Sequence, residues 1–481
     1  MHAAEPVKFH SWPTARKLLK RRNMSNQDSP RHTLGLFSVT AIVISLVIGM
    51  GIFKIPALVA ATSGTESIFF GAWALGGAIA LFGALTYAEI GARLPVMGGY
   101  YKVFAECYHP AIGFTVNALI LVCNAASLAI VVLVGADFAS DLLFGKPAGP
   151  VFNTVVGISG VALFYGVNIL GLKTSSRTQN FLTLLKIGLV VLLVSALFSG
   201  VQVAPHGYED STLYAYNGQN GLFLLMASLI TVSFMYGGYQ HTINFGGELR
   251  AGHILRKSII IGLGTILFVY IALNYTYVQV IGFEKMKNAT AIGALLCESW
   301  FGKAGAKVFD AMMFLSVLSY VNILLMTNPR MMFAMSEDGV FPKLFRWRHP
   351  RTGAMIPGLT VFALATILVV FVGRGIDKIL GFTMFLDSIG MCTSAAAIFI
   401  LRKRGTGDHL VTGTRLRRFT PFFATVFVVG YAGIAIAVVL KDPRSAALGL
   451  GLLLFFLLVY FRFYHKKATR KNFGLADVPD L

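Results

Sequence analysis

Charged side chains are scarce in this sequence. Lysine, arginine, aspartate and glutamate make up 13% of the 481 residues, against about 25% in ordinary soluble domains. Several uncharged stretches, among them 211–247 and 258–283, are longer than the roughly 20 residues that cross a hydrocarbon core as a helix. The scarcity of charge excludes a soluble globular protein and predicts a chain that lies mostly within a lipid bilayer.

Cysteine is also rare, and clusters of reactive side chains are missing. The four cysteines are scattered, without the spacing of a metal site or a disulfide framework, so we expect them to be small packing residues. The sequence shows none of the His, Asp and Glu clusters usual in membrane enzymes. We therefore expect no metal, no cofactor and no enzymatic activity. Residues 1–33 also lack the apolar core of a signal peptide.

Apolar segments dominate the chain and predict an all-α, polytopic membrane protein with twelve transmembrane helices. No segment between them is long enough to form a soluble domain. The predicted spans are 34–60, 66–92, 110–140, 150–171, 179–200, 220–246, 257–283, 306–334, 355–373, 377–401, 418–440 and 445–465.

The net charge of +20 comes from lysines and arginines that lie between alternate spans. They precede the first span and follow the second, fourth, sixth, eighth, tenth and last. Such clusters report topology by the positive-inside rule, so we do not interpret them as a nucleic-acid surface. The rule places both termini in the cytoplasm, in a multi-pass protein of the inner or plasma membrane.

The order of the spans predicts two inverted repeats. Ten spans divide into two fives, and an odd number of crossings makes the second five enter the membrane from the opposite side. The repeats would cover 34–200 and 220–401. Spans eleven and twelve, at 418–465, lie outside them, and the tails 1–33 and 466–481 would be cytoplasmic.

Two apolar spans carry interruptions, at Ile48–Phe53 and at Tyr236–Tyr239. Unpaired backbone groups cost several kcal/mol in hydrocarbon, so a broken helix is tolerated mainly where it lines a cavity with a polar guest. Both interruptions fall in the first helix of their repeat. We therefore predict a transporter whose substrate site lies between them, although a glycine pair alone can also serve close helix packing.

An amino acid suits such a site. The N–H groups around Gly49, Met50 and Gly51 would hold its carboxylate, and carbonyls near Val47 and Phe234 would take its ammonium. Further residues predicted to border the site are Tyr236, Gly237, Gly238, Tyr239 and His241. Asn124 in the third span could face the ligand or could bond to a neighbouring helix.

Several motifs resemble those of the amino acid–polyamine–organocation (APC) superfamily of permeases. In the family's order they extend over about residues 33–400. The motifs are 48–53 (Ile-Gly-Met-Gly-Ile-Phe), 73–77 (Trp-Ala-Leu-Gly-Gly), 84–91, 95–100, 234–239 (Phe-Met-Tyr-Gly-Gly-Tyr), 248–250 and 328–342. The resemblance implies the LeuT-type fold, with twelve helices of which the first and sixth are broken, and amino acid substrates. It also implies that Phe234 gates the ligand. Met50 departs from the pattern, because relatives often have Ser or Thr there, so a hydroxyl contact to the carboxylate is missing.

Lys186 lies within the fifth span, and an intramembrane charge is functional by default. The resemblance implies that it takes the place of a sodium ion and interacts with first-helix carbonyls and with Ser316 and Ser319. Proton coupling is then expected and sodium coupling is disfavoured. The alternative is a lysine that reaches the cytoplasm or only props helices apart.

Asp387 is a second unusual charge, about midway along the tenth span. We hypothesise that it pairs with Lys54, just beyond the first interruption, because pairing would offset much of the burial cost. Alternatively, Asp387 titrates during transport or binds a cationic side chain. Glu89 and Glu248, near helix ends, are expected to form structural ion pairs or caps.

The sequence thus predicts a secondary transporter of neutral amino acids that works by alternating access as a proton symporter. Obligate amino acid exchange is the alternative, because exchangers in the superfamily can carry a similar lysine. A transporter-like amino acid sensor is less favoured, because both tails are short.

Overall fold

The computed structural model of this chain describes residues 33–146, 148–198, 220–250, 253–289, 292–372, 377–411, 415–441 and 443–464. Residues 1–32 and 466–481 of the predicted tails, and most of the loop after the fifth span, lie outside the described residues.

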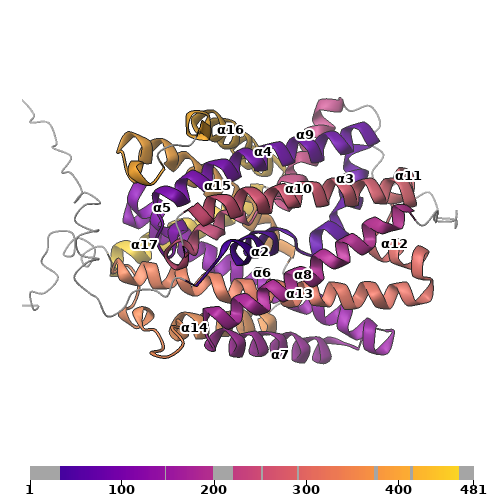
Figure 1. Cartoon of the computed structure of the whole chain (residues 1–481), viewed down its shortest axis with the longest axis horizontal. Coiled ribbons are helices and arrows are strands. Elements are labelled where there is room, and N and C mark those ends of the chain that lie inside the picture. Colours follow the sequence, from indigo (N-terminus) through magenta and orange to yellow (C-terminus); the bar gives the residue numbers. More distant parts are fainter. Residues whose placement is uncertain are drawn as a thin grey trace, which may run out of the picture.

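The described chain is all-helical, and its long helices run roughly along one axis (Figure 1). The long helices are α4 (Glu66–Arg93), α6 (Pro110–Phe144), α7 (Pro150–Ile169), α8 (Leu172–Ser195), α10 (His253–Ile281), α13 (Lys303–Glu337), α14 (Ile356–Val372), α15 (Asp377–Lys403), α16 (Thr420–Lys441) and α17 (Pro443–Phe463). Shorter helices are α2 (Leu36–Val47), α3 (Ile55–Ser63), α5 (Gly99–Cys107), α9 (Gly221–Met235), α11 (Phe283–Lys287) and α12 (Ile292–Phe301).

Ten described helical segments are long and apolar enough to cross a membrane. A helix occupies each of the twelve predicted spans, but two spans fall short of that length. The span 34–60 is divided into α2 and α3, and α14, in the span 355–373, has 17 residues. The protein is therefore a multi-pass membrane protein with ten clear span candidates.

Local sequence signals explain where several long helices begin. Thr65 accepts a hydrogen bond from the Ile68 N–H at the start of α4 (3.4 Å), and Asn220 accepts one from the Leu222 N–H at the start of α9 (3.2 Å). Pro150 begins α7, where a missing N–H costs nothing. Helices α5, α11 and α12 were not predicted, because they are short and lie next to the glycine and proline signals of turns.

The first interruption separates α2 from α3. Helix α2 ends at Val47, Ile48 and Gly49 are extended, and a short 3₁₀-helix, η1 (Met50–Phe53), precedes α3. The interruption predicted from the sequence at 48–53 is therefore present.

The second interruption follows α9. Tyr236 ends that helix, and a 3₁₀-helix, η3 (Tyr239–Asn244), begins after Gly238. Gly238 has φ +111°, which side-chain-bearing residues rarely adopt, and a Cβ there would lie 2.3 Å from the Leu46 carbonyl oxygen. Only glycine fits this position. The missing side chain lets the second interruption approach the backbone of α2 closely.

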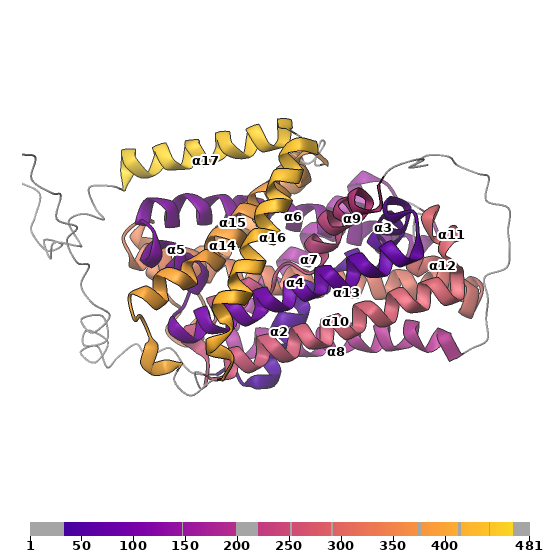
Figure 2. The same ribbon diagram turned by 90° about the horizontal axis from the view of Figure 1, so that it is seen from above.

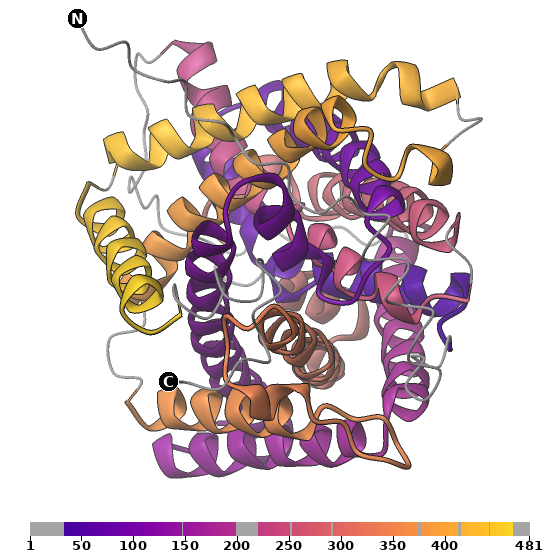
Figure 3. The ribbon, with the colours of Figure 1, turned by 90° about the vertical axis from the view of Figure 1, so that its left-hand side faces the viewer.

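Helix α2 lies inside the bundle, packed against α8, α10, α13 and η3. Helices α7 and α14 pack side by side on one edge of the molecule (Figure 3). Helix α17 lies on another edge, against α6, α15 and α16 (Figure 2). Helix α2 is thus enclosed mostly by continuous helices, whereas α9 keeps several side chains exposed.

Arginine–carboxylate pairs gather at one end of the bundle, which we call the basic end and define by Arg93, Arg330 and Arg402. Glu89 accepts from Arg93 (2.8 Å) and Arg402 (2.5 Å). Glu248 accepts from Arg330 (2.6 Å). The prediction that both glutamates form ion pairs is confirmed.

Gly98, which precedes α5, offers a test of the packing at the basic end. It has φ +64°, and a Cβ there would lie 2.8 Å from the Arg330 carbonyl oxygen. Gly145 has a similar φ of +67° but open space around it. We predict that Gly98→Ala lowers the free energy of unfolding by about 1–3 kcal/mol more than Gly145→Ala, because only Gly98→Ala adds a clash to the shared backbone strain.

Thermal unfolding of the two purified variants in detergent measures the difference. Equal melting temperatures for the two would contradict the close contact between α5 and α13.

Candidate functional site

The two interruptions touch each other inside the bundle. Gly238 lies against the Leu46 carbonyl, and a Cβ on Gly51 would lie 2.6 Å from the Met235 sulfur. The structure therefore brings together the two segments that carry the predicted site residues Val47, Gly49, Met50, Gly51 and 236–239.

Tyr270 on α10 bridges the two broken ends. Its hydroxyl lies within hydrogen-bond distance of two carbonyl oxygens, Val47 at 3.2 Å and Met235 at 3.1 Å. These are the last residues of α2 and α9. Their carbonyls accept no hydrogen bond from the N–H groups of their own helices. One buried side chain thus stabilises both unwound ends.

Aromatic rings support this bridge. Trp73, Tyr236 and Tyr270 pack edge to face or tilted, with ring centroids 5.1–6.0 Å apart. The Tyr236 hydroxyl donates to the Trp73 carbonyl (3.3 Å). Tyr236, predicted to border the site, is therefore buried in this aromatic group together with Trp73 and Tyr270.

Lys186 on α8 reaches the first interruption. Its ammonium donates to the Ile48 carbonyl oxygen at 2.6 Å, and the side chain is 2% exposed. A buried ammonium needs an acceptor, and the extended residue Ile48 supplies one that a continuous helix would have used itself. The expected contact between Lys186 and a first-helix carbonyl is present.

A row of buried hydroxyl and amide groups continues from α2 toward the basic end. The Ser45 and Thr183 hydroxyls are 2.5 Å apart. Ser319 donates to Ser45 (3.4 Å) and accepts from Gln179 (2.9 Å). Gln179 accepts from Asn322 (2.7 Å). This network ties α2 to α8 and α13.

Among the described residues, the hydrogen bond of Lys186 does not go to either of the expected serines. Ser319 belongs to that network, and the Lys186 hydrogen bond goes to Ile48. The Ser316 hydroxyl is buried and has no hydrogen-bond partner among the described residues. A role of the two serines beside Lys186 therefore stays a prediction.

Asn124 on α6 bonds to a neighbouring helix, which is one of the two roles expected for it. Its amide donates to the Asn328 side-chain oxygen on α13 at 2.8 Å. Asn124 is partly buried, so this bond positions the amide and leaves the side chain close to the bundle interior.

Parts of the two interruptions remain accessible. A Cβ on Gly49 would meet nothing within 4 Å, and Phe234, at the end of α9, is 45% exposed. Gly237 and Gly238 are partly exposed. The Tyr239 hydroxyl is buried without a hydrogen-bond partner among the described residues.

The hypothesised pair of Lys54 and Asp387 does not form. Neither residue takes part in the ion pairs found among the described residues. Lys54 is exposed between η1 and α3. The carboxylate of Asp387 instead faces the second interruption, with Oδ2 3.8 Å from the position of a Cβ on Gly237. The prediction failed because Lys54 is exposed and α15 turns Asp387 toward Gly237 in the second interruption.

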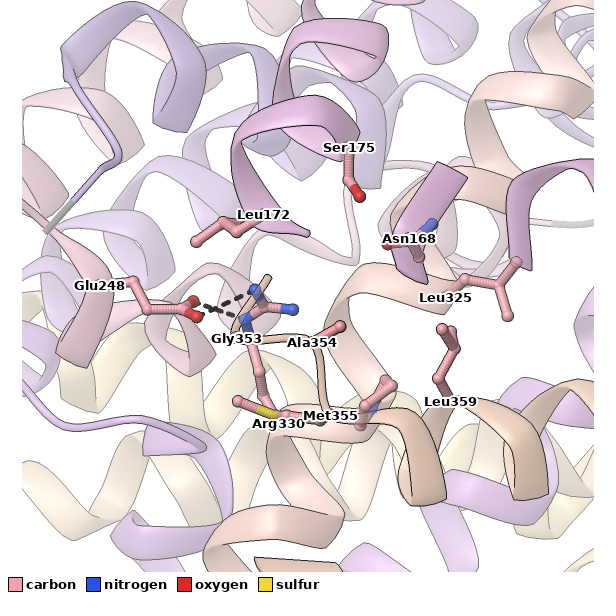
Figure 4. Close-up of a pocket in the computed structure, with 11 residues that line it drawn as sticks. Asn168, Leu172, Ser175, Glu248, Leu325, Arg330, Gly353, Ala354, Met355 and Leu359 are labelled. Atoms are coloured by element: carbon pink, nitrogen blue, oxygen red, sulfur yellow. Dashed lines mark hydrogen bonds and ion pairs between the residues drawn. The ribbon is translucent and has the colours of Figure 1, made fainter. Parts of the chain in front are cut away.

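A small cavity of about 40 Å³ lies at the basic end, beside the ion pair of Glu248 and Arg330 (Figure 4). Its lining includes Asn168, Ser175 and the ion pair of Glu248 and Arg330. Asn322 joins it to the row of polar groups, because it donates to the Ser175 carbonyl (3.1 Å). The cavity has room for one or two waters.

Sequence reasoning missed Tyr270 and the polar row. A tyrosine amid apolar residues was the available signal, since a buried hydroxyl needs a partner. The sequence could not show which carbonyls it reaches. Among the described residues, no group of three or more His, Cys, Asp and Glu could hold a metal ion.

Broken helices that meet inside a bundle of membrane-length helices define a membrane transport protein. Residues 34–462 match the amino acid permease family, and this chain belongs to that family. It is therefore an amino acid transporter and not an enzyme.

The alignments with known relatives cover nearly the whole chain. The chain is 28% identical to the serine/threonine exchanger SteT of Bacillus subtilis, with 91% of this chain and 98% of that protein covered. It is 24% identical to the human Asc-type amino acid transporter 1 (91% and 84%). It is also 24% identical to the cystine/glutamate transporter of Pongo abelii (89% and 85%).

Tyr270→Phe tests the bridge. We predict that it weakens amino acid binding about tenfold, because the two unwound ends lose a shared donor worth about 1–2 kcal/mol. Tyr275→Phe on the same helix is the matched control, since Tyr275 is 49% exposed on the bundle surface.

The dissociation constants of the two purified variants for a transported amino acid measure the effect. Unchanged affinity in Tyr270→Phe would mean that the bridge does not shape the site.

Proposed function

We propose that this protein exchanges neutral amino acids across the cell membrane by alternating access. The observation that carries the proposal is the contact between two helix interruptions whose ends share one buried donor, Tyr270. Partly exposed backbone at both interruptions supports a zwitterionic guest there.

In the proposed binding mode, the N–H groups at Gly49, Met50 and Gly51 hold the substrate carboxylate. These groups begin η1, and the first N–H groups of a helix have no acceptor within it. The open space at Gly49 supports a ligand at this position. Carbonyls at Val47 and Phe234 take the ammonium, and Phe234 covers the ligand.

We further propose a LeuT-type fold in which 34–200 and 220–401 are inverted repeats and 418–465 is a separate pair. Interruptions at equivalent places, near the start of each repeat, support this division. The same proposal places twelve helices in the membrane and the basic end in the cytoplasm, by the positive-inside rule. Both termini are then cytoplasmic.

Exchange is favoured over proton symport. One relative is by name a serine/threonine exchanger, and it aligns over almost its full length. The specific observation that keeps proton symport as the second candidate is Lys186, a buried amine on a carbonyl of the first interruption. In either mechanism, Lys186 holds the broken end of α2 against α8.

Counterflow in proteoliposomes tests the proposal. The purified protein is reconstituted into vesicles loaded with radiolabelled serine, and efflux is followed with and without external amino acids. We predict efflux at least about tenfold faster with external neutral amino acids than in plain buffer, because an exchanger reorients mainly when loaded.

A pH gradient of one unit, inside alkaline, should leave counterflow unchanged. If that gradient drives amino acid uptake into empty vesicles, the proposed exchange is wrong and the protein is a proton symporter. Absence of amino acid movement in every arrangement would refute transport of the tested substrates.

Lys186→Met tests the role of the buried amine. We predict that counterflow falls at least about tenfold, because the Ile48 carbonyl loses a charged hydrogen bond worth roughly 1.5–3 kcal/mol. Lys307→Met is the matched control, since Lys307 is exposed at the start of α13. Full counterflow in Lys186→Met would show that this bond is dispensable.

A further inference from the structure

Asp387 is a carboxylate without a partner inside the bundle. No hydrogen bond or ion pair to it occurs among the described residues, and its side chain is only partly exposed. A carboxylate within a transmembrane bundle is costly unless something pairs with it. Since the described residues supply no such partner, an occupant from outside the protein can take that role.

The second interruption connects Asp387 to the proposed substrate site. Gly238 faces the first interruption, with its Cβ position 2.3 Å from the Leu46 carbonyl oxygen. Its neighbour Gly237 faces Asp387 instead, with its Cβ position 3.8 Å from Oδ2. The absence of a side chain on Gly237 therefore leaves the carboxylate open toward the unwound segment.

Among the described residues, the charge of Asp387 acts on tyrosines of four different elements, namely Tyr100, Tyr239, Tyr320 and Tyr431. Tyr320 is within hydrogen-bond distance of Ser127 (3.2 Å), and Tyr431 donates to the Ser233 carbonyl (3.4 Å). The ion pairs of the described residues do not include Asp387, and the buried amine of Lys186 donates to Ile48.

The two ends of an amino acid are already provided for in the proposed binding mode. A carboxylate at η1 and an ammonium at the carbonyls of Val47 and Phe234 use backbone groups of both interruptions. Asp387 has no part in that binding mode and faces Gly237 from α15, so the group left for it is the substrate side chain. A carboxylate repels a second carboxylate and accepts hydrogen bonds from hydroxyl or ammonium groups.

We propose that Asp387 selects substrates whose side chain carries a hydrogen-bond donor at its end, by accepting that hydrogen bond across Gly237. The inference rests on the proposed function and adds a substrate class to it. Among neutral amino acids, those with a short hydroxyl-bearing side chain are preferred over apolar ones of the same shape.

Threonine and valine provide the first test, because they have nearly the same shape and differ by one donor. In counterflow with labelled serine, wild type should be inhibited by threonine at least about tenfold better than by valine, because a site built for a donor rejects the analogue that lacks it. In Asp387→Leu this preference should disappear or reverse.

Asp137→Asn is the control, since Asp137 is exposed on α6 and accepts from Asn153; its threonine preference should equal that of wild type. Homoserine and 2,4-diaminobutyrate distinguish the two donors, a hydroxyl and an ammonium, at the same position. Asp387→Asn keeps the size of the side chain and should weaken diaminobutyrate more than homoserine.

A variant that folds but does not transport can still be tested for binding. The shift in melting temperature of the purified protein with the same compounds measures that binding. If Asp387→Leu does not fold, the isosteric Asp387→Asn decides through diaminobutyrate, because its amide oxygen still accepts a hydrogen bond from a hydroxyl. Wild-type exchange with equal threonine and valine inhibition would overturn the inference and leave the proposed function intact. So would a threonine preference that survives in Asp387→Leu, or diaminobutyrate binding that is unchanged in Asp387→Asn. Wild-type vesicles without any exchange would instead overturn the proposed function.

Discussion

The structure depends on one constraint, that backbone polar groups at membrane depth must find partners within the protein. Helices α2 and α9 both stop inside the bundle, at Val47 and Met235. The two end carbonyls share the single hydrogen of the Tyr270 hydroxyl, and Lys186 donates to Ile48. A broken helix at membrane depth needs such partners from its neighbours. The interruptions survive because donors from α8 and α10 replace the missing helical hydrogen bonds.

These same donors make the site a shared property of several helices. Helix α2 is held by α8 through Lys186 and the Ser45–Thr183 contact, and by α10 through Tyr270. Movement of α2 during transport would have to break or carry along these bonds. The row of polar groups that reaches the cavity at the basic end links the same helix to the ion pair of Glu248 and Arg330.

Particular residues show how far sequence reasoning reaches. The glycines at 49, 51, 237 and 238 predicted both interruptions, because two such glycine pairs in the first helices of the two repeats indicate broken helices. Lys186 was recognised because a charge in an apolar span is rare. The partner of Asp387 was predicted wrongly, since the rotation of α15 decides which helix it faces. Tyr270 was overlooked, because a tyrosine in a span has no distinctive sequence pattern.

Hydropathy, charge and glycine act locally along the chain, so they were enough to predict the class of protein, the approximate spans and the places where two helices break. The folded bundle was needed to learn that the two breaks touch, that Tyr270 joins them, that Lys186 bonds to Ile48, and that Asp387 faces Gly237 and does not pair with Lys54. Those contacts join segments far apart in the chain. Their geometry depends on how each helix is rotated in the bundle, which no local pattern encodes.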